Sequence, residues 1–110
     1  MKIIICGATG FIGSNLLKHF DNGQNEIFAV YNNRPPIEKI SKNINWFKAD
    51  LRLPDSILPI IQNTDLFLQF AATTSGSKDI TSKPYIHVTD NAIINSYLLR
   101  ACFENKVGHF

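Results

Sequence analysis

The sequence predicts an α/β protein with a doubly wound parallel sheet, covered by helices on both faces. Two observations predict this fold. An apolar run at 2–6 leads straight into closely spaced glycines, and short apolar runs then alternate with amphipathic segments along the chain. Such alternation is typical of right-handed βαβ units, whose strands lie parallel in one sheet. We expect one domain over residues 1–110, with strand order 3-2-1-4 and a fifth strand begun or missing.

The opening stretch predicts a phosphate site. Its β-branched run at 2–6 is typical of a strand buried on both faces, and Gly7, Gly10 and Gly13 follow in the spacing G-x-x-G-x-x-G. The first two glycines allow a sharp turn close to a ligand, and the third allows the next helix to pack tightly on the strand. That helix, beginning near Gly10, offers free N–H groups and the positive end of its dipole to an anion.

Later elements are predicted from their apolar spacing. We expect strands at 26–31, 45–48 and 65–70, and a polar loop at 71–79. Residues 107–110 are typical of the approach to a fifth strand.

Four helices are expected. The first should bury Ile12, Leu16, Leu17 and Phe20, and a short one is expected at 37–40. Another spans 54–62, with Leu58 and Ile61 inward and an irregularity at Pro59. The longest, at 85–105, carries an apolar stripe of Ile93, Ile94, Tyr97, Leu98, Ala101 and Cys102.

Composition excludes several classes of protein. A hydrophobic fraction of 45% and a net charge of +2 are typical of a globular protein that does not bind nucleic acid. No apolar run approaches the roughly 20 residues that cross a bilayer, so we expect a cytoplasmic protein without membrane contact. Cys6 and Cys102 lie in apolar patterns and are expected to be buried free thiols. No Cys or His pair has zinc spacing, so no metal site is predicted.

Several short motifs together carry a family resemblance. They are the glycine turn at 7–13, Asp50-Leu51, Asp65, Phe70-Ala71-Ala72, Asn91, Leu98-Leu99 and Ala101. With these motifs the chain resembles the N-terminal part of the extended short-chain dehydrogenase/reductases, Rossmann-fold enzymes that include NAD(P)-dependent nucleotide-sugar epimerases, dehydratases and reductases such as GDP-fucose synthase.

The resemblance implies roles for matching residues. The pyrophosphate would be received by Gly7, Gly10, Phe11, Ile12 and Gly13. The adenine would lie against Asp50 and Leu51, and the nicotinamide ribose against Ala71 and Ala72. Alternatively, Asp50 only ends a strand, and the two alanines are small only because the crevice is tight.

The residues after the second strand favour NADP over NAD. The sequence there is Tyr31-Asn32-Asn33-Arg34, with no acid to bind a ribose 2′-hydroxyl. Arg34 could pair with a 2′-phosphate, and Asn32 or Asn33 could donate hydrogen bonds to it. The alternative is that Arg34 is a surface residue without a ligand.

The chain departs from the family pattern in two ways. Gln69 stands where a histidine often precedes the alanine pair, and no tyrosine has a lysine four residues later. The catalytic Y-x-x-x-K pair would follow Phe110, so no catalytic residue is assigned and this chain alone is expected to be inactive. In reductases that resemble GDP-fucose synthase a similar loop faces the substrate, so the resemblance implies Thr73, Thr74 and Lys78 as candidate substrate contacts. Alternatively, this loop is only solvated.

The sequence thus predicts the cofactor-binding part of a homodimeric enzyme that transfers hydride between NADP(H), or NAD, and a nucleotide-linked sugar. A non-catalytic dinucleotide sensor is the alternative. A third possibility is a complete small protein, whose missing fifth strand would leave an exposed sheet edge.

Overall fold

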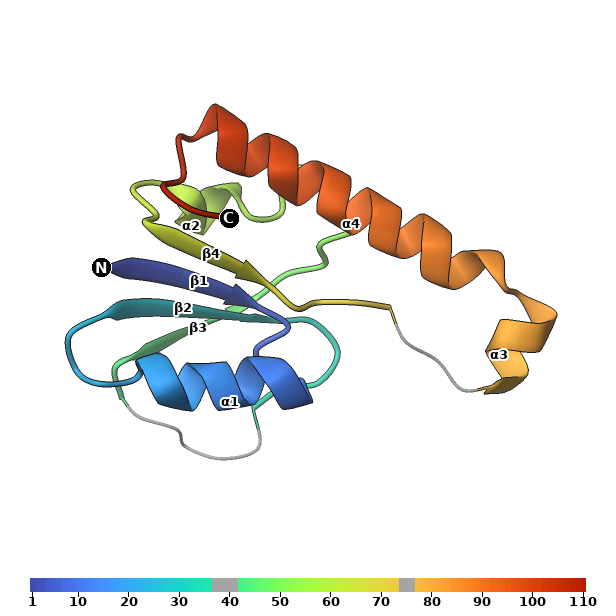
Figure 1. Ribbon diagram of the computed structural model, residues 1–110, viewed down its shortest axis with the longest axis horizontal. Helices are drawn as coiled ribbons and strands as arrows, with labels where there is room; N and C mark the ends of the chain where they lie inside the picture. The colour runs from blue at the N-terminus through green and yellow to red at the C-terminus, as the bar shows by residue number, and fades with distance from the viewer. Residues whose placement is uncertain (37–41, 74–76) are drawn as a thin grey trace.

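The computed structural model describes residues 1–36, 42–73 and 77–110. These residues form one parallel sheet of order β3-β2-β1-β4, which confirms the predicted fold class and strand order. Its strands are β1 (Lys2–Cys6), β2 (Glu26–Tyr31), β3 (Ile44–Lys48) and β4 (Leu66–Gln69). Helix α1 (Phe11–Phe20) covers one face, and α2 (Leu58–Ile61) and α4 (Tyr85–Glu104) lie on the other (Figure 1).

Strand β1 is the centre of the sheet and contributes to two hydrophobic clusters. Ile3 and Ile5 face α1 and pack in the same cluster as Leu17. Ile4 and Cys6 point to the opposite face and belong to the cluster that includes residues of α2 and α4. Since successive side chains of a strand alternate between faces, a continuous apolar run is what such a central strand requires.

Helix α1 corrects one predicted core residue. Gly13 and Leu17 are buried one above the other, whereas Ile12 is 55% exposed. At Gly13 the first turn of α1 packs directly against the backbone that follows β1. A Cβ at this position would lie 2.1 Å from the carbonyl oxygen of Gly7, so there is no room for a side chain. Ile12, about 100° away around the helix, therefore faces away from the sheet.

The helix predicted at 54–62 is shorter than expected. Helix α2 begins only at Leu58, which is exposed, while Ile57, Ile60 and Ile61 are buried. Proline has no N–H to donate and is tolerated only in the first turn of a helix. Pro59 therefore requires the helix to begin just before it.

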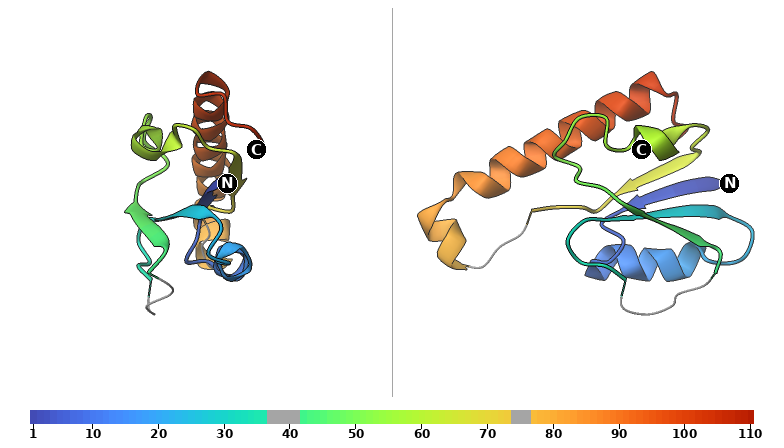
Figure 2. Two further views of the ribbon diagram at one scale, coloured as in Figure 1. Left: turned by 90° about the vertical axis from the view of Figure 1, so that its left-hand side faces the viewer. Right: turned by 180° about the vertical axis from the view of Figure 1, so that it is seen from behind.

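Helix α4 confirms the longest predicted helix, with a narrower buried stripe. Tyr97 was expected in the core, but its side chain lies at the margin of the stripe and is 37% exposed. Figure 1 and the rear view in Figure 2 show α4 extending past the carboxyl ends of the strands, with the short helix α3 (Ser77–Ser82) beyond it. The buried stripe consists of Ile94, Leu98, Ala101 and Cys102.

The last residues return to the sheet. The backbone N–H of Phe67 donates to the carbonyl of His109 over 2.8 Å, and His109 forms an isolated parallel bridge with Leu66. This bridge confirms the approach to a fifth strand beside β4. The helix predicted at 37–40 lies outside the described residues.

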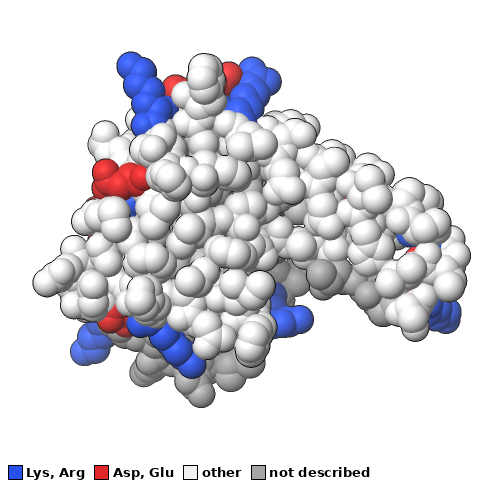
Figure 3. Space-filling model, viewed as in Figure 1, with Lys and Arg blue, Asp and Glu red and all other residues white. Residues whose placement is uncertain are grey.

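The two cysteines, the helices and the surface charges bear on the remaining predictions. Cys6 and Cys102 are buried free thiols, as predicted. No helix within the described residues is long and apolar enough to cross a membrane. On the face in Figure 3, lysine and arginine side chains are dispersed rather than gathered in one patch.

Candidate functional site

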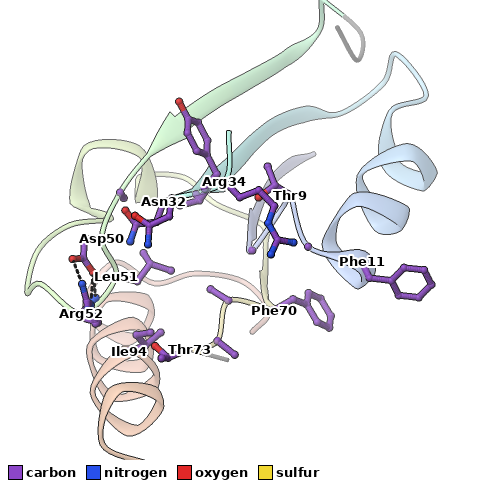
Figure 4. A pocket seen from close by; sticks show the side chains of 18 residues that line it. Thr9, Phe11, Asn32, Arg34, Asp50, Leu51, Arg52, Phe70, Thr73 and Ile94 are labelled. Atoms are coloured by element: carbon purple, nitrogen blue, oxygen red, sulfur yellow. Dashed lines mark hydrogen bonds and ion pairs between the residues drawn. The ribbon is translucent and has the colours of Figure 1, made fainter. Parts of the chain in front are cut away.

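A cavity of about 510 Å³ opens at the carboxyl ends of the strands (Figure 4). It lies where the chain leaves β1 toward α1 on one side and leaves β4 toward α4 on the other. This is the point at which strand order reverses, and ligands of doubly wound folds bind at such a point. The cavity is lined by Gly7, Thr9, Gly10, Phe11, Val30, Tyr31, Asn32, Asn33, Arg34, Ala49, Asp50, Leu51, Arg52, Phe70, Ala71, Ala72, Thr73 and Ile94.

The glycine turn brings two backbones into close contact. Gly7 has φ +73°, a conformation that favours glycine, and a Cβ there would lie 2.6 Å from the carbonyl carbon of Phe70. The N–H of Gly10 donates to the carbonyl of Gly7 over 3.0 Å, which closes the turn. Gly7 thus has a structural reason to be glycine, and Gly10 closes the turn through its backbone at the predicted phosphate site.

The first turn of α1 faces this site without a capping side chain. Gly10 is the N-cap, and no described side chain accepts a hydrogen bond from the N–H groups that follow it. Phe11 lines the cavity, but its ring is 85% exposed and points away in Figure 4, so its backbone is the part available to a ligand. Of the predicted pyrophosphate residues, all of them described, Ile12 and Gly13 do not line the cavity.

The segment after β2 supplies polar side chains to the cavity. Asn32, Asn33 and Arg34, the residues predicted to select the dinucleotide, all line it. In Figure 4 the side chain of Arg34 extends from the end of β2 over the cavity. A guanidinium in that position offers several N–H donors to an anion.

The segment after β3 contributes an acid that is already paired. Arg52 Nε donates to Asp50 Oδ1 over 3.0 Å and Nη2 donates to Oδ2 over 2.9 Å, while the Arg52 backbone N–H donates to Oδ1 over 3.1 Å. These hydrogen bonds hold the pKa of the Asp50 carboxyl below its usual value. Leu51 is buried beside it.

Arg52 lines the cavity and was missed by the sequence analysis. Its spacing of two residues from Asp50 was the available signal. Because the guanidinium also approaches Asp90 on α4, with Nη1 3.7 Å from Oδ2, it has a partner that no local pattern indicates.

The segment after β4 is held by side chains from two elements. Gln69 donates from Nε2 to the carbonyl of Ala71 over 2.9 Å and accepts at Oε1 from the Ala71 N–H over 3.1 Å. The same Nε2 is 3.0 Å from Asn95 Oδ1 on α4. Ala71 and Ala72 both line the cavity, so Gln69 fixes the backbone at the predicted nicotinamide-ribose position.

The candidate substrate residues are separated. Thr73 lines the cavity, and its backbone N–H donates to Asn91 Oδ1 over 2.7 Å. Thr74 lies outside the described residues. Lys78 was expected in a polar loop, but it is on helix α3 and does not line the cavity. Hydrogen bonds from Thr81 and Ser82 to the carbonyl of Lys78 stabilise this short helix.

Arg34 and the N-terminus of α1 offer hydrogen-bond donors and positive charge to the cavity, which would suit an anion. Within 1–36, 42–73 and 77–110, no group of three or more His, Cys, Asp or Glu side chains could hold a metal ion. The site consists of a glycine turn, a helix N-terminus, the segment after β2 with Arg34, and the Asp50–Arg52 pair.

The family comparison matches nearly the whole chain. Residues 3–110 match the sequence model of one family, which is described as the NAD dependent epimerase/dehydratase family. Among curated proteins, no sequence matches the chain.

Solved structures with the same fold include sugar-nucleotide epimerases. UDP-glucose 4-epimerase from Bifidobacterium longum, solved with NAD+ and UDP, is 20% identical with a TM-score of 0.80. The enzyme from Thermus thermophilus, solved with NAD, is 25% identical with a TM-score of 0.77. The enzyme from Thermotoga maritima, solved with UDP-glucose, is 21% identical with a TM-score of 0.79. In each case 97% of this chain is covered, but only 35% of the length of the solved chain.

Proposed function

The chain belongs to the NAD-dependent epimerase/dehydratase family, and we therefore propose that its cavity binds a nicotinamide dinucleotide. On the residues after β2, we propose that this is NADP in preference to NAD. We propose further that the whole protein acts on a nucleotide-linked sugar. The observation that carries the dinucleotide proposal is the cavity at the β1/β4 switch point, between the uncapped N-terminus of α1 and the side chain of Arg34. Its volume of about 510 Å³ lies within the usual range for small-molecule sites.

The described residues fit such a cofactor. The pyrophosphate would lie at Gly7 and Gly10, where a Cβ on Gly7 would already meet backbone atoms and the α1 N–H groups have no side-chain cap. The adenine would lie against Asp50 and Leu51, and the nicotinamide ribose against the Ala71 backbone. When bound, the nicotinamide would supply hydride transfer.

The choice of NADP rests on the residues after β2. Arg34 is exposed and extends over the cavity, where its guanidinium could pair with a 2′-phosphate, and Asn32 and Asn33 are neutral. A carboxylate at this position would instead repel that phosphate. NAD is the competing cofactor, since two of the similar epimerases were solved with it.

The substrate and assembly are proposed for the whole protein. Thr73, which lines the cavity near α4, would contact a nucleotide-linked sugar. Lys78, on α3 and outside the cavity lining, would contact only a part of the substrate that extends beyond the cavity. The tyrosine and lysine of the family's proton-transfer pair are absent from this sequence, so we expect the 110-residue chain alone to bind cofactor without turning over substrate. Homodimers would form through exposed apolar residues in the second half of α4, among them Tyr97, Leu99 and Phe103.

Titration of the purified chain with NADPH and NADH, followed by cofactor fluorescence, tests the proposal. Hydrogen bonds to charged groups contribute about 1.5–3 kcal/mol, so Arg34→Ser should weaken NADPH binding by roughly ten- to a hundredfold and leave NADH binding unchanged. Arg100→Ser is the matched control, because it removes the same charge from an exposed position on α4 outside the cavity. Equal or tighter binding of NADH by the unaltered chain would refute the NADP assignment.

A non-catalytic dinucleotide sensor would pass the binding test equally. Turnover of UDP-sugars by the whole protein separates the two functions, because a sensor binds NADPH without converting any sugar.

A further inference from the structure

We propose that Arg52 is a positioning residue for dinucleotide binding. Its guanidinium contacts both Asp50, which follows β3, and Asp90 on α4, and so links the segment after β3 to α4 at the wall of the cavity. This inference rests on the proposed function, because it assigns Arg52 a part in dinucleotide binding. Arg52 belongs to the lining of the cavity, and the sequence motifs give it no role.

The first half of the coupling is the contact with Asp50. Both carboxylate oxygens accept a hydrogen bond from the guanidinium, over 3.0 and 2.9 Å, and Oδ1 also accepts from the Arg52 backbone N–H. Such bidentate geometry fixes the plane of the carboxylate as well as its position. Asp50 is therefore held in one orientation before a ligand arrives.

The second half is the contact with α4. Arg52 Nη1 is 3.7 Å from Asp90 Oδ2, and the hydroxyl of Thr73 is 3.5 Å from the same oxygen. Thr73 is also joined to the next residue of α4, because its N–H donates to Asn91 Oδ1. A continuous series of polar contacts thus leads from Asp50 after β3 to Thr73 after β4, and both of these residues line the cavity.

The charges explain why the arrangement affects an anionic ligand. One guanidinium is shared by two carboxylates, Asp50 and Asp90, whose side chains are 27% and 25% exposed. Without Arg52, Asp50 would lose the partner that fixes its orientation, and both carboxylates would lose the cation that offsets their charge at the wall of the cavity. Arg52 is itself 49% exposed, so its ion pairs add little to folding stability, and its main effect is on ligand affinity.

The test compares NADPH with ADP, which carries the adenine and pyrophosphate but no nicotinamide. Arg52→Gln should weaken both ligands about tenfold, and Asp90→Asn should weaken NADPH about threefold while leaving ADP unchanged. Arg52 and Asp90 act through one contact, so the variant that carries both substitutions should bind NADPH with the affinity of Arg52→Gln alone, within a factor of two. Arg52→Lys keeps the charge without the bidentate geometry and should restore only part of the lost affinity.

Arg100→Gln is the control, since it breaks an arginine–glutamate pair of 2.9 Å on α4 away from the cavity. Urea unfolding of each variant shows whether the effect is merely structural. A lowered midpoint with unchanged ligand affinities would overturn the inference, as would NADPH and ADP binding by Arg52→Gln within twofold of the unaltered chain. If the unaltered chain binds neither NADPH nor NADH, the proposed function fails and this inference fails with it.

Discussion

Replacing Gly13 by alanine tests whether the glycine turn is set by packing of α1 on the end of β1. The added Cβ would lie 2.1 Å from the carbonyl oxygen of Gly7 and 2.8 Å from its carbonyl carbon. Ordinary contacts begin near 3.4 Å, so the two backbones would have to separate by roughly an ångström. Neither can yield by a side-chain rotation, because all the atoms concerned except the new methyl belong to the main chain.

The size of the effect follows from two opposing contributions. Overpacking in a tightly packed interior costs typically 1–3 kcal/mol, and a clash between backbones lies at or above the upper end of that range. Alanine gains about 1 kcal/mol over glycine in a helix interior, which offsets part of the cost. We expect a net loss of about 2 kcal/mol in the free energy of unfolding, or a fall in Tm of about 10 °C for a domain of this size.

Urea unfolding followed by circular dichroism measures this loss. Gly10→Ala is the matched control in the same turn, because Gly10 has φ −76° and its Cβ would meet only the Gly7 oxygen, at 3.3 Å. The control should lose less than about 1 kcal/mol. A Gly13→Ala variant as stable as the unaltered chain, within about 0.5 kcal/mol, would refute the packing argument.

Three further predictions concern side chains around the cavity and in the core. Gln69→Ala should weaken NADPH binding several-fold with ADP binding unchanged, because it frees the Ala71 backbone; equal loss for both ligands would contradict this. Burial raises the pKa of Cys102 to about 11 and that of Cys6 further, so iodoacetamide at pH 8 should label neither thiol until urea unfolds the chain. Hydrogen bonds from Arg52 lower the pKa of the Asp50 carboxyl in the folded chain. The ionised carboxyl therefore stabilises the folded state above its unfolded pKa of about 4, and this stabilisation is lost as the pH falls through the lower pKa of the folded state. Between pH 7 and 2 the Asp50→Asn variant should therefore lose less stability than the unaltered chain, by under about 1 kcal/mol in urea titrations, and identical losses would argue against the pairing.

The strands were predictable because each is a short apolar run with a turn on either side. Lys2–Cys6 and Glu26–Tyr31 have the predicted bounds. The third strand begins one residue earlier than predicted, and the fourth is one residue shorter at each end. A parallel strand that is buried on both faces is a nearly continuous apolar run, so the run itself is enough to predict it. The glycine turn was predictable from its spacing directly after the first apolar run.

Helix faces were less predictable, because the side of a helix that is buried depends on its partner. Ile12 is apolar but exposed, since Gly13 makes the close contact with the end of β1. Tyr97 fits the apolar spacing of α4 but lies at its margin. The spacing of apolar residues gives the period of a helix, but not which side the sheet will meet.

The contacts around the cavity were beyond sequence reasoning for a different reason. Arg52 after β3 meets Asp90 on α4, and Gln69 meets Asn95 across a separation of 26 residues. Such pairs carry no local pattern, because polar residues at strand ends and on exposed helix turns are common everywhere. Only the fold brings them together.

The two faces of β1 imply an order of events during synthesis. The buried residues of the α1-side cluster all lie between Ile3 and Ile44, so this half of the core can close before the remainder of the chain has been made. The other cluster joins Ile4 and Cys6 to residues as distant as Cys102, and it must wait for α4. A nascent chain of about 50 residues would thus hold a half-covered sheet, with one face of β1 open to solvent or to a chaperone until α4 arrives.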